Sequence, residues 1–216
     1  MKFNKRVLYL IQQAGALLQT PRSHKRTLGT AFDTVASHSH HVSIIAYCIS
    51  RMEGLSHEDG LKTLAMAAFH DLAEARTGDL DLISKHYTKD DEAKAINDQF
   101  KGIEFGNDLE KLLKEYISRR TKVAKCAKDA DSLAQMYHEW ALTWQGNKLA
   151  EQWFEDDFID RVPNMYTESA RKLANSMKKS NPNEWWWAEF INKDGGAKNL
   201  KHLLGKSCKE KKSKRE

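Results

Sequence analysis

Apolar residues recur at intervals of three and four positions along most of the chain. This period matches one face of an α-helix, whereas the alternation of apolar and polar residues that marks a half-buried strand is almost absent. The pattern therefore predicts an all-α protein built as a helical bundle. The expected helices cover residues 3–18, 35–52, 58–76, 89–104, 108–116, 119–144, 149–157, 164–179 and 183–191.

Polar side chains interrupt the apolar stripes of three expected helices. In the second helix, His38 lies three positions after Val35 and four before Val42, so it faces inward with them. In the sixth helix, Asp131 lies seven positions after Ala124 on a stripe of mostly small residues. One edge of the apolar face of the third helix carries three polar residues, which are His70, Asp71 and Glu74.

Carboxylates on core-facing stripes need compensation, because burying an unpaired carboxylate is costly. One divalent cation would compensate all of them, since imidazoles and carboxylates bind such ions and the cation cancels the negative charge. Each residue alone has a simpler interpretation. A single inward histidine such as His38 is more often a hydrogen-bonded core residue, and a single inward carboxylate such as Asp131 is more often an ion-pair partner. The combined pattern favours a metal site.

The order of these residues resembles the H…HD…D signature of the HD-domain metal-dependent phosphohydrolases, an all-helical superfamily. His38 matches the first histidine, and His70 with Asp71 matches the central pair. Asp131 matches the last aspartate.

The residues around this signature resemble the 5′-deoxynucleotidase branch of the superfamily. Residues 33–39, DTVASHS, are similar to its E-x-V-x-E-H-S block. Residues 70–80, HDLAEARTGDL, are similar to its H-D-x-x-E-x-x-x-G-D block. Arg22 is similar to the arginine that precedes the first block, and the whole resemblance spans residues 8–145.

Carried over to the matching positions, the resemblance implies an HD-domain bundle that hydrolyses deoxyribonucleoside 5′-monophosphates to deoxynucleoside and phosphate. It implies that Glu74 orients or deprotonates the attacking water, that Arg22 binds the phosphate and that Asp79 contacts the sugar. The metal ligands that it implies are His38, His70, Asp71 and Asp131. Mixed nitrogen and oxygen ligands suit Co, Mn, Fe, Zn or Mg, and the resemblance favours Co or Mn.

The sequence departs from the family pattern around the first histidine. Ser37 stands where the branch has a glutamate, and Asp33 replaces the leading glutamate of the block. His41 could share the face of His38, so a shifted register in which His41 binds the metal stays open. Asp129 falls on a different face of its helix from the inward aspartate, and we expect it to be exposed.

The substrate assignment has alternatives. Arg26 is a rival for the role of Arg22, because Ser23 and His24 replace the Gly-Trp that usually follows the arginine of this branch. An HD hydrolase could act on another phosphate ester, such as a nucleoside triphosphate, an alarmone or a cyclic nucleotide. A metal-stabilised regulatory or binding module without catalytic activity is the remaining alternative.

Composition separates a basic tail from the body of the chain. The length of 216 residues suits one domain, expected over residues 1–192, followed by a partly disordered basic appendage over 193–216. Residues 206–216 contain six Lys or Arg and two Glu, so they supply +4 of the formal net charge of +5. Because the body is nearly neutral, we do not expect nucleic acid as a partner.

Cysteine usage and hydropathy bear on the compartment. The 3 cysteines have unrelated spacings, which predict neither a disulfide framework nor a thiolate zinc site and fit a reducing environment. No run approaches the roughly 18 apolar residues of a membrane span, and the amphipathic first helix lacks the pattern of a signal peptide. We therefore expect a cytoplasmic protein with no membrane partner.

The tryptophans raise the question of a second subunit. Trp140 and Trp144 are spaced for core packing, with a base-stacking wall beside the site as the alternative. Trp185, Trp186 and Trp187 cannot all face inward on one helix, so at least one should be exposed or covered by another subunit. This run suggests a homodimer, in addition to the small nucleotide expected as substrate.

Overall fold

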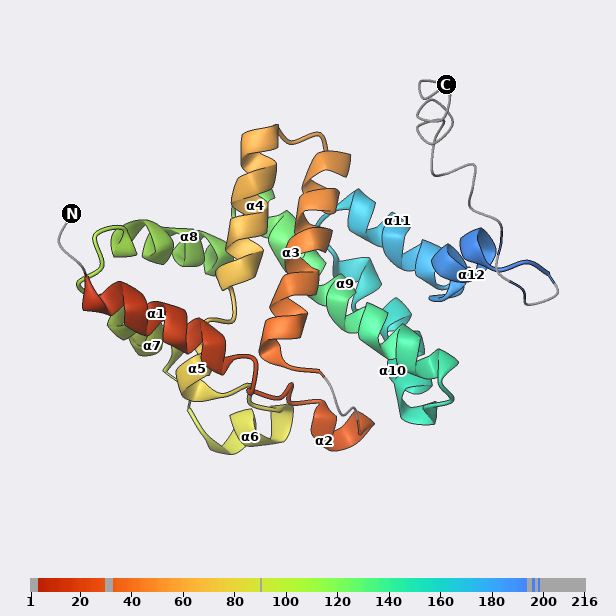
Figure 1. Cartoon of the computed structure of the whole chain (residues 1–216), viewed down its shortest axis with the longest axis horizontal. Coiled ribbons are helices and arrows are strands. Elements are labelled where there is room, and N and C mark those ends of the chain that lie inside the picture. Colours follow the sequence, from red (N-terminus) through yellow and green to blue (C-terminus); the bar gives the residue numbers. More distant parts are fainter. Residues whose placement is uncertain (1–3, 30–32, 90, 194–195, 197, 199–216) are drawn as a thin grey trace, which may run out of the picture.

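A computed structural model describes residues 4–29, 33–89, 91–193, 196 and 198 of the chain (Figure 1). Apart from isolated bridge residues, the regular structure of this part is helical, which confirms the all-α prediction. The helices are α1 (Lys5–Ala16), α2 (Lys25–Leu28), α3 (Val35–Met52), α4 (His57–Phe69), α5 (Glu74–Thr77), α6 (Leu82–Tyr87), α7 (Glu92–Phe100), α8 (Gly106–Ser118), α9 (Lys122–Trp144), α10 (Lys148–Asp160), the 3₁₀ turn η1 (Val162–Asn164), α11 (Glu168–Met177) and α12 (Glu184–Phe190).

Helices α3, α4 and α9 form the centre of the bundle, where each packs against the other two (Figure 1). The stripe predicted on α3 is its contact face, since Val35, Val42 and Ile49 are fully buried. On α9, Ala127 and Ala130 are fully buried as well. Because these side chains are small, the backbone of α9 can lie close to its two neighbours.

Two groups of helices flank this centre on opposite sides (Figure 1). Helices α1, α5, α7 and α8 lie on one side and bury residues such as Leu10, whereas α10 and α11 lie on the other and bury residues such as Phe154. Val35 belongs to the first of these apolar clusters and Val42 to the second. His38 therefore lies where the two clusters meet.

The helix expected over 58–76 is broken in the structure. Helix α4 ends at Phe69 and α5 begins at Glu74, and several backbone N–H groups between them bond to carbonyls three residues earlier. The chain is thus tightened into a 3₁₀-like turn. This turn carries His70 and Asp71. The apolar spacing continues through the break, so periodicity gives no sign of it.

Two short helices, α2 and α6, were not expected from the sequence. They have 4 and 6 residues, which is too short for a helical period to be recognised. Gly29 ends α2 with a φ of 72°, in the left-handed region that favours glycine. Asp81 caps α6 by accepting the backbone N–H of Ser84.

Asp129 is buried, so the prediction that it is exposed is wrong. Its carboxylate accepts hydrogen bonds from the backbone N–H groups of Tyr166 and Thr167 at 3.0 and 2.7 Å, and from the Thr167 hydroxyl at 2.7 Å. The helix expected over 164–179 is not continuous, because η1 ends at Asn164 and α11 begins only after its N-cap, Thr167. The carboxylate therefore fastens the start of α11 to α9.

The tryptophans divide between core and surface. Trp140 is buried and packs edge-on against Tyr137, with 5.6 Å between ring centroids. Trp144, in the last turn of α9, is 53% exposed, so the core-packing prediction is wrong for this residue. On α12, Trp185 and Trp187 are 70% and 53% exposed, which confirms that the run does not face inward as a whole.

The prediction of a basic appendage over residues 193–216 falls almost entirely outside the described residues, and its boundary with the bundle stays a prediction. In the described part of the chain, no helix combines the length and the apolar character that crossing a membrane requires.

Candidate metal centre

Four side chains from three separate segments meet at the centre of the bundle. His38 comes from α3, His70 and Asp71 from the turn after α4, and Asp131 from α9. His38 Nε2 lies 3.0 Å from Asp131 Oδ1 and 3.7 Å from Asp71 Oδ2. His70 Nε2 lies 3.0 Å from Asp71 Oδ2 and 3.8 Å from Asp131 Oδ1. The structure thus brings together all four residues that the family resemblance implies as metal ligands.

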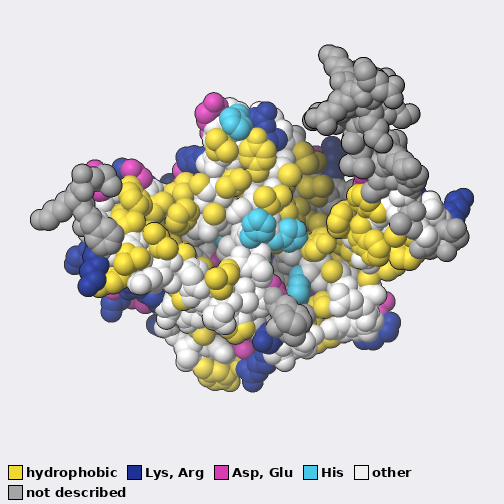
Figure 2. Space-filling view, in the orientation of Figure 1, with side chains coloured by type: hydrophobic (Ala, Val, Ile, Leu, Met, Phe, Trp, Pro, Cys, Tyr) yellow, Lys and Arg dark blue, Asp and Glu magenta, His cyan; other side chains and the backbone are white. Residues whose placement is uncertain are grey.

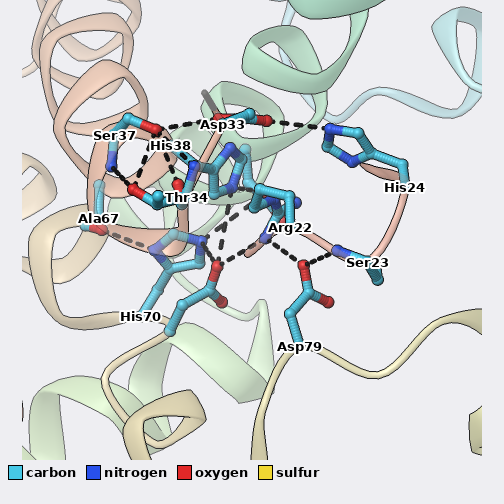
Figure 3. A network of polar contacts seen from close by, with 12 residues as sticks. Arg22, Ser23, His24, Asp33, Thr34, Ser37, His38, Ala67, His70 and Asp79 are labelled. Atoms are coloured by element: carbon cyan, nitrogen blue, oxygen red, sulfur yellow. Dashed lines mark hydrogen bonds and ion pairs between the residues drawn. The ribbon is translucent and has the colours of Figure 1, made fainter. Parts of the chain in front are cut away.

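The two imidazoles point toward one another, with 5.5 Å between their ring centroids (Figure 3). His70 Nδ1 lies 2.6 Å from the backbone oxygen of Ala67, and because a carbonyl only accepts, this nitrogen donates. Its Nε2 is buried, makes no hydrogen bond and faces the cluster. Metal-binding histidines are commonly fixed in this way, with the second ring nitrogen donating to a carbonyl.

Asp131 has two further partners that the sequence did not reveal. Lys128 Nζ lies 2.7 Å from Asp131 Oδ2, and the Tyr116 hydroxyl donates to the same oxygen at 3.3 Å. Lys128 lies three positions before Asp131 on one helix face, so its spacing could have indicated the contact. Tyr116 comes from α8, and no local pattern connects it with α9.

The cluster carries an excess of negative charge. Burial, together with the charges of Asp71 and Asp79, raises the pKa of Glu74 to about 9. Burial alone would lower the pKa of His70, but the charges of Asp71 and Asp131 raise it to about 10. A cation would offset this excess, and two imidazoles with two carboxylates are a donor set that fits a divalent metal ion.

Arg22 approaches the cluster from the segment before α2. Its Nη1 lies 3.4 Å from Asp71 Oδ2 and 3.1 Å from Asp79 Oδ2. Asp79 Oδ2 also accepts the backbone N–H of Ser23 at 3.0 Å (Figure 3). The Nε of Arg22 is buried and makes no hydrogen bond, so this guanidinium retains donor capacity beside the cluster.

One cavity of about 390 Å³ joins these groups. Glu74 contributes to its wall, and Glu74 Oε2 is buried without a hydrogen-bond partner. The lining includes every residue of the predicted site except His38, namely Arg22, His70, Asp71, Glu74, Asp79 and Asp131.

The alternatives left open by the sequence lie elsewhere. Arg26 is 67% exposed in its side chain and pairs with Asp81 at 3.2 Å, away from this cavity. His41 packs edge-on against Tyr137, with 4.7 Å between ring centroids. His40 is exposed. The geometry therefore favours Arg22 over Arg26, and His38 over His41.

The HD domain family matches residues 14–177, and the chain belongs to that family. A conserved hypothetical protein from Pyrococcus furiosus shares 26% identity and the fold, with a TM-score of 0.67 over 80% of this chain and 99% of that one. A protein from Pyrococcus horikoshii shares the fold at 24% identity, with a TM-score of 0.66 over 80% of this chain and 98% of that one.

The same fold occurs in a protein described as a predicted metal-dependent phosphohydrolase from Magnetospirillum magnetotacticum. It is 18% identical to this chain, with a TM-score of 0.61 over 81% of this chain and 93% of that one. No curated protein matches this chain in sequence.

Proposed function

We propose that this protein is a metal-dependent phosphohydrolase that converts deoxyribonucleoside 5′-monophosphates to deoxynucleoside and phosphate. The observation that carries the proposal is the cluster of two histidines and two aspartates beside the guanidinium of Arg22. A cation-binding cluster next to an arginine suits the charge of a phosphate monoester. Membership of the HD-domain family supports this class of reaction, as does the fold shared with a protein described as a phosphohydrolase.

The metal ligands in this proposal are His38, His70, Asp71 and Asp131. A divalent ion bound by them supplies a Lewis acid that polarises the phosphoryl group and makes a water molecule easier to deprotonate. Co, Mn, Fe, Zn and Mg all accept mixed nitrogen and oxygen ligands, and the resemblance to 5′-deoxynucleotidases favours Co or Mn.

We assign to Glu74 the removal of a proton from the attacking water. Its unpartnered Oε2 can accept the proton of the attacking water when the carboxyl group is ionised. Burial and the charges of Asp71 and Asp79 raise its pKa to about 9, and a cation held by the cluster would lower that pKa. The water oxygen attacks phosphorus in line, the bond from phosphorus to the 5′ oxygen breaks, and that oxygen takes up a proton. No covalent intermediate is required.

We assign binding of the substrate phosphate to Arg22, because its guanidinium can bind two phosphate oxygens at once. Asp79 holds Arg22 in place through the 3.1 Å ion pair and the hydrogen bond from Ser23. Both contacts use Asp79 Oδ2, so the other carboxylate oxygen can accept a hydrogen bond from a sugar hydroxyl.

The test is phosphate release from a panel of deoxyribonucleotides and ribonucleotides with Co, Mn, Fe, Zn and Mg. We expect release from deoxyribonucleoside monophosphates, strongest with Co or Mn. Glu74→Gln should keep its metal content and lose activity by at least ~100-fold, the usual contribution of a general base. His70→Ala should lose both metal and activity.

Glu189→Gln is the matched control, because Glu189 is exposed on α12. It should behave as wild type. Absence of phosphate release from every monophosphate would refute the proposed activity. Release only from triphosphates, alarmones or cyclic nucleotides would retain the reaction class and replace the substrate.

We also propose that α12 contributes to a homodimer. Hydrophobic side chains gather over α11 and α12 (Figure 2), where Trp185 and Trp187 are exposed. Exposed aromatic patches of this kind favour association. Sedimentation at micromolar concentration should give a dimer that the double variant W185S/W187S converts to monomer, whereas a monomeric wild type would exclude this proposal.

A further inference from the structure

A second cluster of metal-binding side chains lies near the first and shares no residue with it. His24 follows Arg22 by two residues, Asp33 precedes α3, and His138 comes from α9. His24 Nε2 lies 2.9 Å from Asp33 Oδ2, and His138 Nδ1 lies 3.8 Å from the same oxygen. One ligand atom from each residue lies within 4.8 Å of the other two. Figure 3 shows His24 and Asp33 pointing toward one another.

These distances suit a small cation. A zinc ion binds nitrogen and oxygen at about 2.0–2.1 Å, so neighbouring ligands in a tetrahedral site are separated by about 3.4 Å. The two separations measured from Asp33 Oδ2 fall on either side of that value. Side-chain shifts of a few tenths of an ångström would equalise them.

Hydrogen bonds do not account for all the polar groups of this cluster, because His138 makes none with the other two residues. Asp33 Oδ2 is paired with His24, and Asp33 Oδ1 accepts the hydroxyl of Ser37 at 3.0 Å. His138 Nε2, in contrast, is buried and makes no hydrogen bond, while Nδ1 is too far from Asp33 for one. A metal ion between Nδ1 and Asp33 Oδ2 would give Nδ1 a partner and leave the ring proton on Nε2.

Protonation equilibria support the same interpretation. The rings of His24 and His138 lie 4.8 Å apart, so two imidazolium charges would repel one another. Burial and nearby positive charge lower the pKa of His138, which leaves its ring neutral and able to bind a metal at pH 7. Although burial would raise it, the hydrogen bonds from His24 and Ser37 hold the pKa of Asp33 below its usual value.

We propose that His24, Asp33 and His138 bind a second metal ion, of which zinc is the best match. Two histidines and one carboxylate with a fourth position open to water form a recurrent zinc arrangement. Asp33 and His138 line a cavity of about 750 Å³, which gives an ion and its water access. The ion would join three segments of the chain, and one of them carries Arg22.

This site shares no ligand with the proposed catalytic centre. The cavity at the catalytic centre is lined by Arg22, His70 and Asp131, whereas the second cavity is lined by Asp33, His41 and His138. His38 borders the second cavity. A second ion there would hold the Arg22 segment in position, because its ligand His24 follows Arg22 by two residues.

The experiment is zinc binding to chelator-stripped protein, measured by equilibrium dialysis and elemental analysis without substrate. We expect about two zinc ions per wild-type chain, and His24→Ala and His138→Ala should each lose about one of them. His70→Ala should lose the other. The double variant H70A/H138A should bind almost none.

His40→Ala is the matched control, because this histidine is exposed on α3 and belongs to neither cluster. It should retain wild-type stoichiometry. Unchanged zinc content in both H24A and H138A overturns the proposal. Loss of zinc from these variants with wild-type content in H70A supports the second site while refuting the catalytic one.

Anomalous diffraction at the zinc edge locates bound zinc in the wild-type protein, so it does not depend on any substitution. Wild-type crystals grown with zinc should show a peak between His24 Nε2, Asp33 Oδ2 and His138. A peak at the first cluster without one here overturns the proposal, even if the variants fail to fold.

Discussion

Helix α9 carries two carboxylates in opposite electrostatic environments. Asp131 faces the two histidines of the candidate metal centre and Lys128, whereas Glu139 faces Asp157 of α10. Although burial would raise it, the hydrogen bond from His38 and the charges of His70 and Lys128 hold the pKa of Asp131 well below its usual value. Burial and the charge of Asp157 raise the pKa of Glu139 to about 8.

The surroundings of Glu139 explain the difference. Gln135 donates to Glu139 Oε1 and Arg161 donates to Asp157 Oδ1, each at 2.7 Å. The other oxygen of each carboxyl group is buried without a hydrogen bond from another residue. One proton shared by these two oxygens would satisfy both. Burial of a carboxylate therefore does not by itself point to a metal site.

The largest effect is expected at Asp131. Asp131→Asn keeps the shape of the side chain and removes its charge, so the affinity of the centre for Mn²⁺ should fall by ~100-fold or more, with phosphate release falling to background. Manganese titration followed by electron paramagnetic resonance measures the affinity. Asp156→Asn, exposed on α10, is the control. Equal affinity in D131N and D156N would contradict the assignment of Asp131 as a ligand.

A third acidic residue of α9 sharpens the comparison, because Asp129 stabilises the fold through hydrogen bonds alone. Asp129→Ala removes three acceptor contacts and leaves two backbone N–H groups at the start of α11 unpaired. We expect a loss of about 3 kcal/mol in the free energy of unfolding, measured by urea denaturation. Asp129→Asn should recover part of it, and a D129A variant as stable as wild type would show that the contacts are dispensable.

The smallest effect is expected at Glu139 and depends on pH. Below the ordinary glutamate pKa of 4.5, the folded and unfolded states both bind the proton. As pH rises toward 8, the unfolded chain releases it while the folded chain retains it, so wild type loses stability. Glu139→Gln avoids this loss and should be more stable by about 2 kcal/mol at pH 9.

Thermal melts of wild type and E139Q from pH 5 to pH 9 test this prediction. The difference in Tm should be small at pH 5 and widen as pH rises. Parallel curves would mean that Glu139 ionises in the folded protein as it does in the unfolded chain. Glu189→Gln, on the surface, should follow wild type throughout.

Helical periodicity predicted the fold class and the inward positions of His38 and Asp131, because the period alone determines which residues share a face. It failed at Asp129, whose hydrogen-bond partners lie 37 and 38 positions away in the chain. Cys126, Leu133 and Met136 are buried three, four and seven positions from Asp129, so α9 has a second apolar face, which the stripe through Asp131 does not reveal.

The second cluster was missed for a related reason. His24 departs from the family pattern, Asp33 replaces a glutamate, and His138 lies seven positions after Asp131 on the same helix face. Each had a local explanation, and no spacing connects residues from a loop, a helix start and the middle of α9. Only the tertiary structure places their ligand atoms within 4.8 Å of one another.

The turn between Phe69 and Glu74 has a consequence for how this stretch tolerates insertions and deletions. With three residues per turn, one added or deleted residue rotates everything after it by about 120°. Such a change before Glu74 would swing its carboxyl group away from the wall it shares with His70 and Asp71. The number of residues in this turn is therefore constrained more tightly than the identity of Leu72, which should accept another apolar side chain where no indel is tolerated.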